Sequence, residues 1–174
     1  MIKFPKQFSS SFIALYGDCT KQGPIADPKW QASYLVRVQT PFTMFYAGQP
    51  MTKGLLLNKF CKAAFLEAMN TVWKEAGQKQ KTIDAWKVSV FGGSYNHRLM
   101  RGGNRPSMHS FGIAFDHYPE QNGLGDYTPF FQPDHPLVRA YLAAGATWGG
   151  DWNGNKKVLD ERRPDGMHFQ FASV

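Results

Sequence analysis

The sequence contains few cysteines and no long apolar run. Its two cysteines, Cys19 and Cys61, can form at most one bridge and lack the paired spacing of a zinc-thiolate site, so we expect two free thiols. No stretch approaches the roughly 20 consecutive apolar residues that are needed to span a bilayer. These absences exclude a disulfide scaffold and a membrane-spanning chain, and they favour a globular domain.

Signals for targeting or for division into domains are also missing. The start, MIKFPKQFSSSFIALYGD, has neither a sustained apolar segment nor a small-residue cleavage site, so we expect synthesis in the cytoplasm without a signal peptide. We find no repeat, low-complexity segment or long linker. We therefore expect one domain over residues 1–174, with residues 1–85 as a basic section of the core and residues 86–174 carrying the functional site.

Acidic residues are scarce in the first half of the chain. The 174 residues carry 20 basic and 13 acidic side chains, and up to Lys81 the count is eleven basic against four acidic. An excess of positive charge favours polyanionic partners. The zinc-finger, helix-turn-helix and basic-aromatic patterns of nucleic-acid binding are absent. We therefore expect no nucleic-acid partner, a possible anionic wall or membrane surface, and a monomer.

Three segments have the patterns of strands and loops. Residues 34–39 (YLVRVQ) alternate weakly and predict a strand, whereas the proline-containing residues 41–50 predict a loop. Residues 86–91 (WKVSVF) predict a strand that ends at the glycine pair 92–93.

Two segments predict helices. From Asn58 to about Ala76, apolar residues recur every three or four positions, and Gly77 supplies a stop. A second helix is expected from Asp134 as its N-cap to Gly145, with a proline in its first turn. We interpret both apolar stripes as core.

Histidines and aspartates are concentrated in the second half. Residues 107–116 read SMHSFGIAFD and include His109 and Asp116, and PDGMHFQF places Asp165 three residues before His168. Catalytic zinc sites usually take three protein ligands and leave one position for water. Two histidines and one aspartate suffice for such a site, with the fourth group as base. We interpret the other histidines, His97, His117 and His135, as hydrogen-bonded core or surface residues.

The same residues resemble a known family. The pattern Ser107-x-His109-x-x-Gly112-x-Ala114-x-Asp116, followed by Asp165-x-x-His168, is similar to the signature of the VanY-like M15 zinc peptidases. FGGSYNHRLMRGG at residues 91–103 and WGGDW at residues 148–152 resemble the subgroup of phage endolysins and bacterial L-alanyl-D-glutamate peptidases. The chain departs from the family at His117 and Tyr118, where an aliphatic residue and asparagine are common.

The resemblance implies roles for individual residues. It implies that His109, Asp116 and His168 bind zinc and that Asp165 is the general base. It also implies that Arg98 stabilises the developing oxyanion.

Other residues are candidates for supporting roles. Arg101 is the alternative to Arg98 and a candidate substrate-binding residue. Ser107 and Asp151 are expected to orient ligands and loops near the substrate. Trp148, with Trp152, either walls the cleft or fills the core.

The resemblance also implies a fold and a function. The fold would be α+β, Hedgehog/D,D-peptidase-like, with a small, mainly antiparallel sheet and helices on one side. The function would be cleavage of the peptidoglycan stem peptide between L-alanine and D-glutamate, by a phage or prophage endolysin that reaches the wall after holin action or lysis. Two alternatives stay open: a D-alanyl-D-alanine carboxypeptidase with the same zinc site, and a zinc-stabilised binding module without catalysis.

Overall fold

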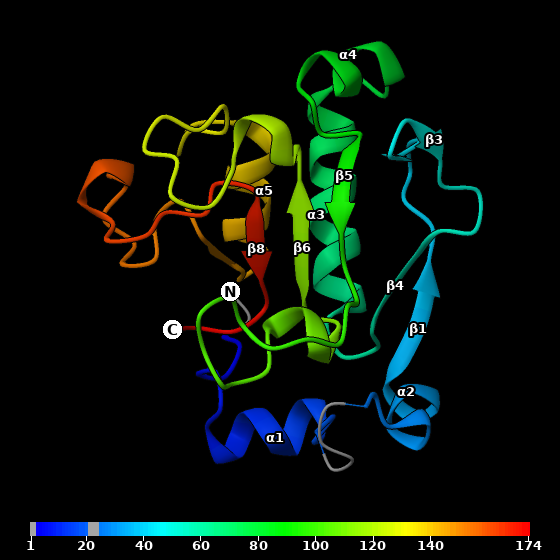
Figure 1. The fold of residues 1–174 in the computed structure, drawn as a ribbon. Coiled ribbons are helices and arrows are strands. Elements are labelled where there is room, and N and C mark those ends of the chain that lie inside the picture. Colours follow the sequence, from blue (N-terminus) through cyan, green and yellow to red (C-terminus); the bar gives the residue numbers. More distant parts are fainter. Residues whose placement is uncertain (1–2, 21–24) are drawn as a thin grey trace.

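A six-stranded sheet forms the centre of the protein in the computed structural model, which describes residues 3–20 and 25–174 (Figure 1). In spatial order its strands are β3 (Gln49–Pro50), β2 (Phe45–Tyr46), β5 (Val90–Gly93), β6 (Ala114–His117), β8 (His168–Gln170) and β7 (Thr147–Trp148). Neighbouring strands run antiparallel except β2 and β5. A separate antiparallel pair consists of β1 (Leu35–Val38) and β4 (Leu55–Asn58). The expected α+β class with a mainly antiparallel sheet is confirmed.

Helices cover one side of this sheet. The α-helices are α1 (Ser10–Tyr16), α2 (Pro28–Tyr34), α3 (Lys62–Glu75), α4 (Gln80–Ala85) and α5 (Pro136–Ala143), and the 3-10 helices are η1 (Met108–Phe111), η2 (Pro119–Gln121) and η3 (Val158–Asp160). The helices α3 and α5 pack together behind β6 and β8, and α1 lies beyond one end of the sheet (Figure 1). Among the described residues, no helix has the length and apolar character that crossing a membrane requires.

The alternation of side chains along β6 and β8 gives the sheet two different faces. Phe115 of β6 stacks on Phe65 of α3 with ring centroids 4.7 Å apart, and Phe169 of β8 stacks on Tyr141 of α5 at 4.3 Å. All four rings are completely buried. Because side chains alternate between faces, the intervening residues of both strands face away from the helices.

Residues of the N-terminal section pack into the core. Phe12 of α1 packs edge-on against Phe111 at 4.9 Å. The hydroxyl of Tyr16 donates a hydrogen bond to the carbonyl oxygen of Phe171 at 2.6 Å, and the indole of Trp30 donates to the carbonyl oxygen of Tyr16 at 2.9 Å. These contacts tie α1 and the start of α2 to Phe111 and to Phe171, which follows the last strand, so the two sections of the chain share one core.

Both cysteines are free thiols, as predicted. Cys19 and Cys61 are completely buried and form no disulfide. Burial, with a further contribution from the charge of Asp18, raises the pKa of Cys19 to about 12. Burial also raises the pKa of Cys61 far above its usual value. Since the thiolate is the reactive form, neither residue is a nucleophile or a metal ligand at neutral pH.

The predicted strands are correct in part. Strand β1 lies within residues 34–39, and β5 begins at Val90, later than the predicted residues 86–91, because Trp86 closes helix α4. The prediction of a loop at residues 41–50 was wrong, because β2 and β3 form a short hairpin there. Its two-residue turn, Ala47 and Gly48, has φ values of 48° and 76°. Alanine is uncommon at positive φ, so the usual asparagine-glycine signal for this turn is missing.

The predicted helices are present with different starts. Helix α3 begins at Lys62, not Asn58, because Asn58 ends β4 and its side chain accepts a hydrogen bond from the backbone N–H of Phe60 in the turn that follows. Helix α5 is capped by His135 rather than by Asp134, since the His135 ring accepts from the N–H of Leu137.

Candidate metal centre and catalytic cleft

Three side chains from different parts of the chain converge on one point. Asp116 of β6 and His168 of β8 are direct cross-strand partners on the face that points away from the helices, and His109 of η1 lies beside them. The Nε2 atom of His109 and the Nδ1 atom of His168 each lie 3.2 Å from Oδ1 of Asp116. One potential ligand atom from each residue lies within 4.8 Å of the others. The structure therefore brings together the three predicted ligands.

Helix η1 holds His109 through contacts at both of its ends. The Ser107 side chain accepts a hydrogen bond from the backbone N–H of His109 at 3.3 Å. Gly112 ends the turn with a φ of 67°, where a Cβ atom would lie 2.8 Å from the Leu35 side chain. Its carbonyl oxygen accepts from the N–H of Asn58 at 2.8 Å. Ser107 thus orients His109, and Gly112 allows the close packing of η1 against Leu35 and Asn58.

Hydrogen bonds on the far side of each imidazole fix its tautomer. The carbonyl oxygen of Ser94 accepts from Nδ1 of His109 at 2.6 Å, so the Nε2 atom carries a lone pair. The Gln170 amide donates to the carbonyl oxygen of Ala172, which turns its Oε1 toward Nε2 of His168 at 3.1 Å. Nε2 of His168 is then the protonated nitrogen, and its Nδ1 carries the lone pair. Partners of this kind normally orient histidine ligands of metals.

The donor set fits a divalent metal ion. In the tautomers fixed by Ser94 and Gln170, the lone pairs of both imidazoles face Oδ1 of Asp116, and Nε2 of His109 is buried without a hydrogen-bond partner. Burial by itself raises the pKa of Asp116, but the two imidazoles outweigh it and hold this pKa far below the usual range. Burial lowers the pKa of His168, whereas Asp116 raises it, and the net shift is upward. Two nitrogens and a carboxylate oxygen form a suitable set for zinc.

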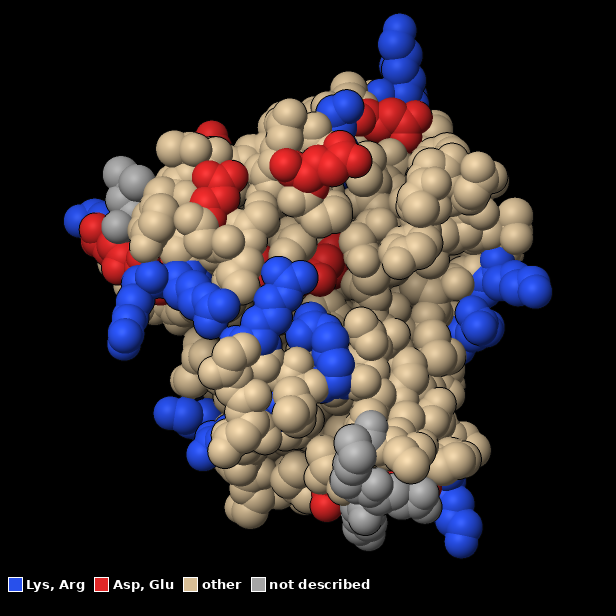
Figure 2. Space-filling model, viewed as in Figure 1, with Lys and Arg blue, Asp and Glu red and all other residues tan. Residues whose placement is uncertain are grey.

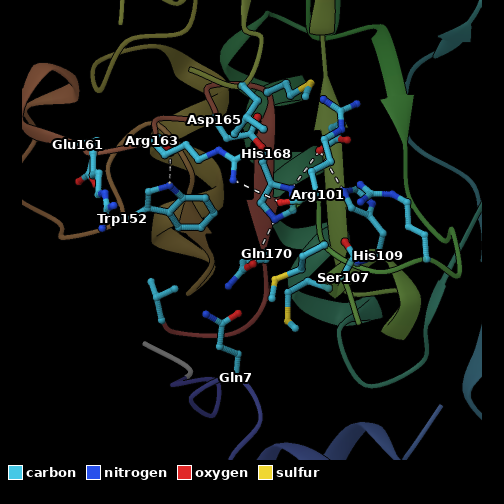
Figure 3. A pocket seen from close by; sticks show the side chains of 18 residues that line it. Gln7, Arg101, Ser107, His109, Trp152, Glu161, Arg163, Asp165, His168 and Gln170 are labelled. Atoms are coloured by element: carbon cyan, nitrogen blue, oxygen red, sulfur yellow. Dashed lines mark hydrogen bonds and ion pairs between the residues drawn. The ribbon is translucent and has the colours of Figure 1, made fainter. Parts of the chain in front are cut away.

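Asp165 lies next to this set but outside it. Figure 3 shows Asp165 beside His168 at the wall of the cleft. Its Oδ1 atom is buried without a hydrogen-bond partner. Burial raises the pKa of Asp165 to about 6, helped by the charge of Asp116, whereas His168, His109 and Arg101 lower it. A partly buried carboxylate whose pKa lies close to neutrality is suited to general acid-base work.

Gly149 allows the backbone to hold Asp165 in place. The backbone N–H of Asp165 donates to the carbonyl oxygen of Gly149 at 2.8 Å. A Cβ atom on Gly149 would lie 2.5 Å from the carbonyl oxygen of Asp165 and 2.8 Å from the Trp152 ring. A larger residue would therefore displace the carboxylate.

The three converging residues and Asp165 lie in a cleft of about 400 Å³. Basic side chains gather around a recessed acidic group at the hollow in the middle of this face (Figure 2). The other residues that line the cleft are Gln7, Arg98, Met100, Arg101, Ser107, Met108, Leu124, Trp152, Glu161, Arg162, Arg163, Met167, Gln170 and Val174. The labelled side chains come from several elements, with Gln7 and Asp165 at opposite ends of the close-up view (Figure 3).

Both candidate arginines line this cleft. The guanidinium of Arg98 donates to the carbonyl oxygen of its neighbour Leu99 at 3.2 Å, and the Arg98 backbone bonds to the Ser110 hydroxyl at 2.9 Å. Arg101 is exposed, and its charge reaches Asp165. Their positions are compatible with a role in binding or stabilising a negatively charged group.

Two other predicted substrate residues lie away from the cleft. Trp148 is 1 % exposed, donates to the carbonyl oxygen of Gly166 at 2.8 Å and stacks against Phe169, so it fills the core. Asp151 is buried, and its two carboxylate oxygens accept from the backbone N–H groups of Asn155 and Lys156. Asp151 therefore organises a loop and has no contact with the cleft.

The remaining histidines lie outside the converging set, as expected. His117 follows Asp116 on β6, so its side chain lies on the opposite, core-facing side of the sheet. Its Nδ1 donates to the carbonyl oxygen of Val88, and its Nε2 accepts from the hydroxyl of Tyr141. Burial lowers the pKa of His117 to about 4. This residue is a neutral part of the core, and His135 is a helix cap.

Sequence reasoning missed several residues of the site. Gln170, which orients His168, follows it by two positions and thus lies on the same face of β8, a signal that the alternation could have given. Arg163 lines the cleft but stands in a charged run without a recognisable motif. The carbonyl oxygen of Ser94, which orients His109, has no side-chain signal.

Two buried histidines and a partly buried aspartate beside a further carboxylate are suited to holding a divalent metal ion next to an acid-base group. Residues 101–171 match the family model described as D-alanyl-D-alanine carboxypeptidase, which belongs to the peptidase M15 models. The resemblance to the M15 peptidases is confirmed over this segment, which contains all three converging residues and Asp165. No curated protein and no solved structure matched the chain.

Proposed function

We propose that the protein is a zinc-dependent peptidoglycan hydrolase that cleaves the stem peptide between L-alanine and D-glutamate, as a phage or prophage endolysin. The observation that carries the proposal is the convergence of three lone pairs, from His109, Asp116 and His168, next to the carboxylate of Asp165, whose Oδ1 atom is buried. The first three residues would hold the zinc ion. Zinc in such a site lowers the pKa of a water ligand to about 7 and polarises carbonyl groups.

The protein's own groups perform the proton transfers. Asp165 accepts a proton from the attacking water and later delivers it to the leaving amine nitrogen, a double role that its pKa of about 6 permits. Arg98 places a positive charge at the cleft, where it stabilises the developing oxyanion. Ser94 and Gln170 keep the two imidazoles in the ligating tautomer.

The shape of the site supports cleavage within the stem. An endopeptidase requires a groove that accepts substrate on both sides of the scissile bond, and the cleft continues past His168 from Asp165 to Gln7 (Figure 3). The sequence motifs of residues 91–103 and 148–152 point to the same subgroup. The second candidate, a D-alanyl-D-alanine carboxypeptidase, is favoured by the description of the matching family model.

Incubation with purified sacculi tests whether the protein is a hydrolase. We expect the zinc-loaded protein to release new amino groups from sacculi and the chelated protein to release none. Binding to sacculi without any release would instead establish the non-catalytic module.

The basic half of the chain supports a proposed mode of wall binding. Lys3, Lys6, Lys29 and Lys53 are all exposed, and Lys21 lies outside the described residues. If these lysines concentrate the enzyme on an anionic wall or membrane surface, activity on intact sacculi should fall as salt rises, because salt screens exposed charges. Activity on a short soluble peptide should stay constant.

Parallel salt curves for the two substrates would contradict this steering role and leave the lysines a role in solubility.

We propose that the enzyme is made in the host cytoplasm and reaches the wall after holin action or lysis.

A further inference from the structure

Two rims of the cleft meet above the candidate metal site. One rim is a hairpin-like segment of residues 98–107, closed by a hydrogen bond from the N–H of Ser107 to the carbonyl oxygen of Arg98. The other rim is the segment of residues 151–164. Nη1 of Arg163 lies 3.4 Å from the carbonyl oxygen of Arg101, so a side chain of the second rim spans the cleft to the first (Figure 3).

Both arginines are held close to the reacting groups. The Trp152 indole donates to the carbonyl oxygen of Arg163 at 3.1 Å, and its ring packs 5.7 Å from the ring of His168. This contact ties the Arg163 backbone to the metal site. On the opposite rim, the positive charge of Arg101 lowers the pKa of Asp165, the group that would protonate the leaving amine.

Among the described residues, neither of these arginines forms an ion pair with an acidic side chain. In the part of the chain that the structure describes, arginine and lysine ion pairs join Arg139 to Glu75 and Lys157 to Asp160, and neither Arg101 nor Arg163 takes part in one. Two unpaired guanidinium groups that line one cleft are suited to a ligand carboxylate, because their N–H groups match its two oxygens.

The stem peptide offers a carboxylate at the corresponding place. In the stem, D-glutamate continues through its γ-carboxyl, so the residue that supplies the scissile nitrogen of the L-alanyl-D-glutamate bond carries a free α-carboxylate. In a terminal D-alanyl-D-alanine, the residue that supplies the scissile nitrogen also carries a free α-carboxylate. The two substrates therefore share a negative charge on the carbon next to the leaving nitrogen.

We propose that Arg101 and Arg163, from opposite rims of the cleft, together bind the α-carboxylate of the residue that supplies the leaving amine. This inference rests on the proposed peptidase function and names the group that the site recognises. It places the carboxylate two bonds from the nitrogen that Asp165 protonates. Under this proposal, both candidate substrates are recognised through the carboxylate that they share. The choice between the two bonds then depends on whether the cleft has space for the chain that continues from the γ-carboxyl group of D-glutamate.

Two soluble peptides that differ only at this carboxylate test the proposal. One is L-Ala-γ-D-Glu-L-Lys, and the other carries an α-carboxamide on the glutamyl residue. With zinc-loaded wild-type protein we expect kcat/KM to be roughly 10- to 100-fold higher for the carboxylate peptide, as for a charged hydrogen-bonded contact. Arg101→Gln and Arg163→Gln should each reduce this preference about tenfold or more, because kcat/KM falls further for the carboxylate peptide than for the carboxamide peptide. The control is Arg105→Gln, an exposed arginine of the same rim that does not line the cleft.

The outcomes separate this proposal from the proposed function. An equal loss on both peptides, or an unchanged preference in either variant, would overturn carboxylate binding while the peptidase function stands. If the wild-type protein cleaves only N-acetyl-D-Ala-D-Ala, the bond assignment is wrong, and the same comparison is made with that peptide and its carboxamide. Cleavage of none of these peptides by zinc-loaded protein would overturn the function and this inference together.

Discussion

Asp165→Ala is expected to retain one zinc ion per chain and to lower turnover by roughly 10² to 10⁴, the range typical of a lost general acid or base. The metal should stay because Asp165 lies outside the set formed by His109, Asp116 and His168. Turnover should fall because the buried Oδ1 atom of Asp165 has no structural partner to lose, so its removal affects proton transfer rather than folding. The measurements are zinc content and the rate of amine release from a soluble stem peptide.

Two further variants make the Asp165 result specific. Asp165→Asn keeps the size of the side chain and should lose turnover to a similar extent, since an amide cannot accept the proton. Asp151→Asn changes an aspartate that only binds the backbone of its own loop, so it should retain turnover. Loss of zinc from Asp165→Ala would make this residue a ligand. Near-normal turnover would remove it from the mechanism, and Glu161, which lines the cleft, would become the next candidate.

His168→Ala is expected to lose stoichiometric zinc and, with it, all measurable hydrolysis. The side chain supplies one of three ligand atoms, and a two-ligand site would not retain the ion through purification. Both histidines must be neutral and Asp116 ionised to bind, so acidification or a chelator should also remove the metal from the wild-type protein. Elemental analysis of protein whose near-UV circular dichroism confirms folding measures this effect.

Two other substitutions control for the metal-loss experiment. His135→Ala removes a helix-capping histidine far from the ligand set and should keep the zinc. Gln170→Leu leaves all three ligands in place but removes the acceptor for Nε2 of His168, so zinc affinity should fall roughly 10- to 100-fold. Full zinc retention in folded His168→Ala protein would show that the ligand assignment is wrong.

The ligand set could be predicted because its chemistry is local in the sequence. His109 and Asp116 stand seven residues apart around a glycine, and Asp165 precedes His168 by three, so the residue types sufficed for a zinc site, and the resemblance to the M15 peptidases supplied the individual roles. Their convergence could not be derived from the spacing, because it depends on the pairing of β6 with β8, which places Asp116 opposite His168 across 52 residues of chain.

The parts that sequence reasoning missed depend on packing between distant segments. Trp148 and Trp152 stand four residues apart in one glycine-rich turn, yet one is buried in the core and the other lines the cleft. The role of Arg163 could not be predicted because it depends on the opposite rim of the cleft, where its guanidinium reaches the carbonyl oxygen of Arg101. The boundaries of α3 and α5 shifted for a similar reason, since the side chains of Asn58 and His135 make turn and cap contacts that periodicity does not reveal.

Mass spectrometry of sacculi digested with the zinc-loaded protein tests the central claim most directly. An L-alanyl-D-glutamate endopeptidase leaves L-alanine on the glycan and exposes a new amino terminus on D-glutamate, which dinitrophenyl labelling identifies. We expect that product from the zinc-loaded protein, and we expect it to be absent when the digestion is repeated with Asp165→Ala. Free D-alanine as the main product, with the stems otherwise intact, would contradict the proposed bond and establish the carboxypeptidase.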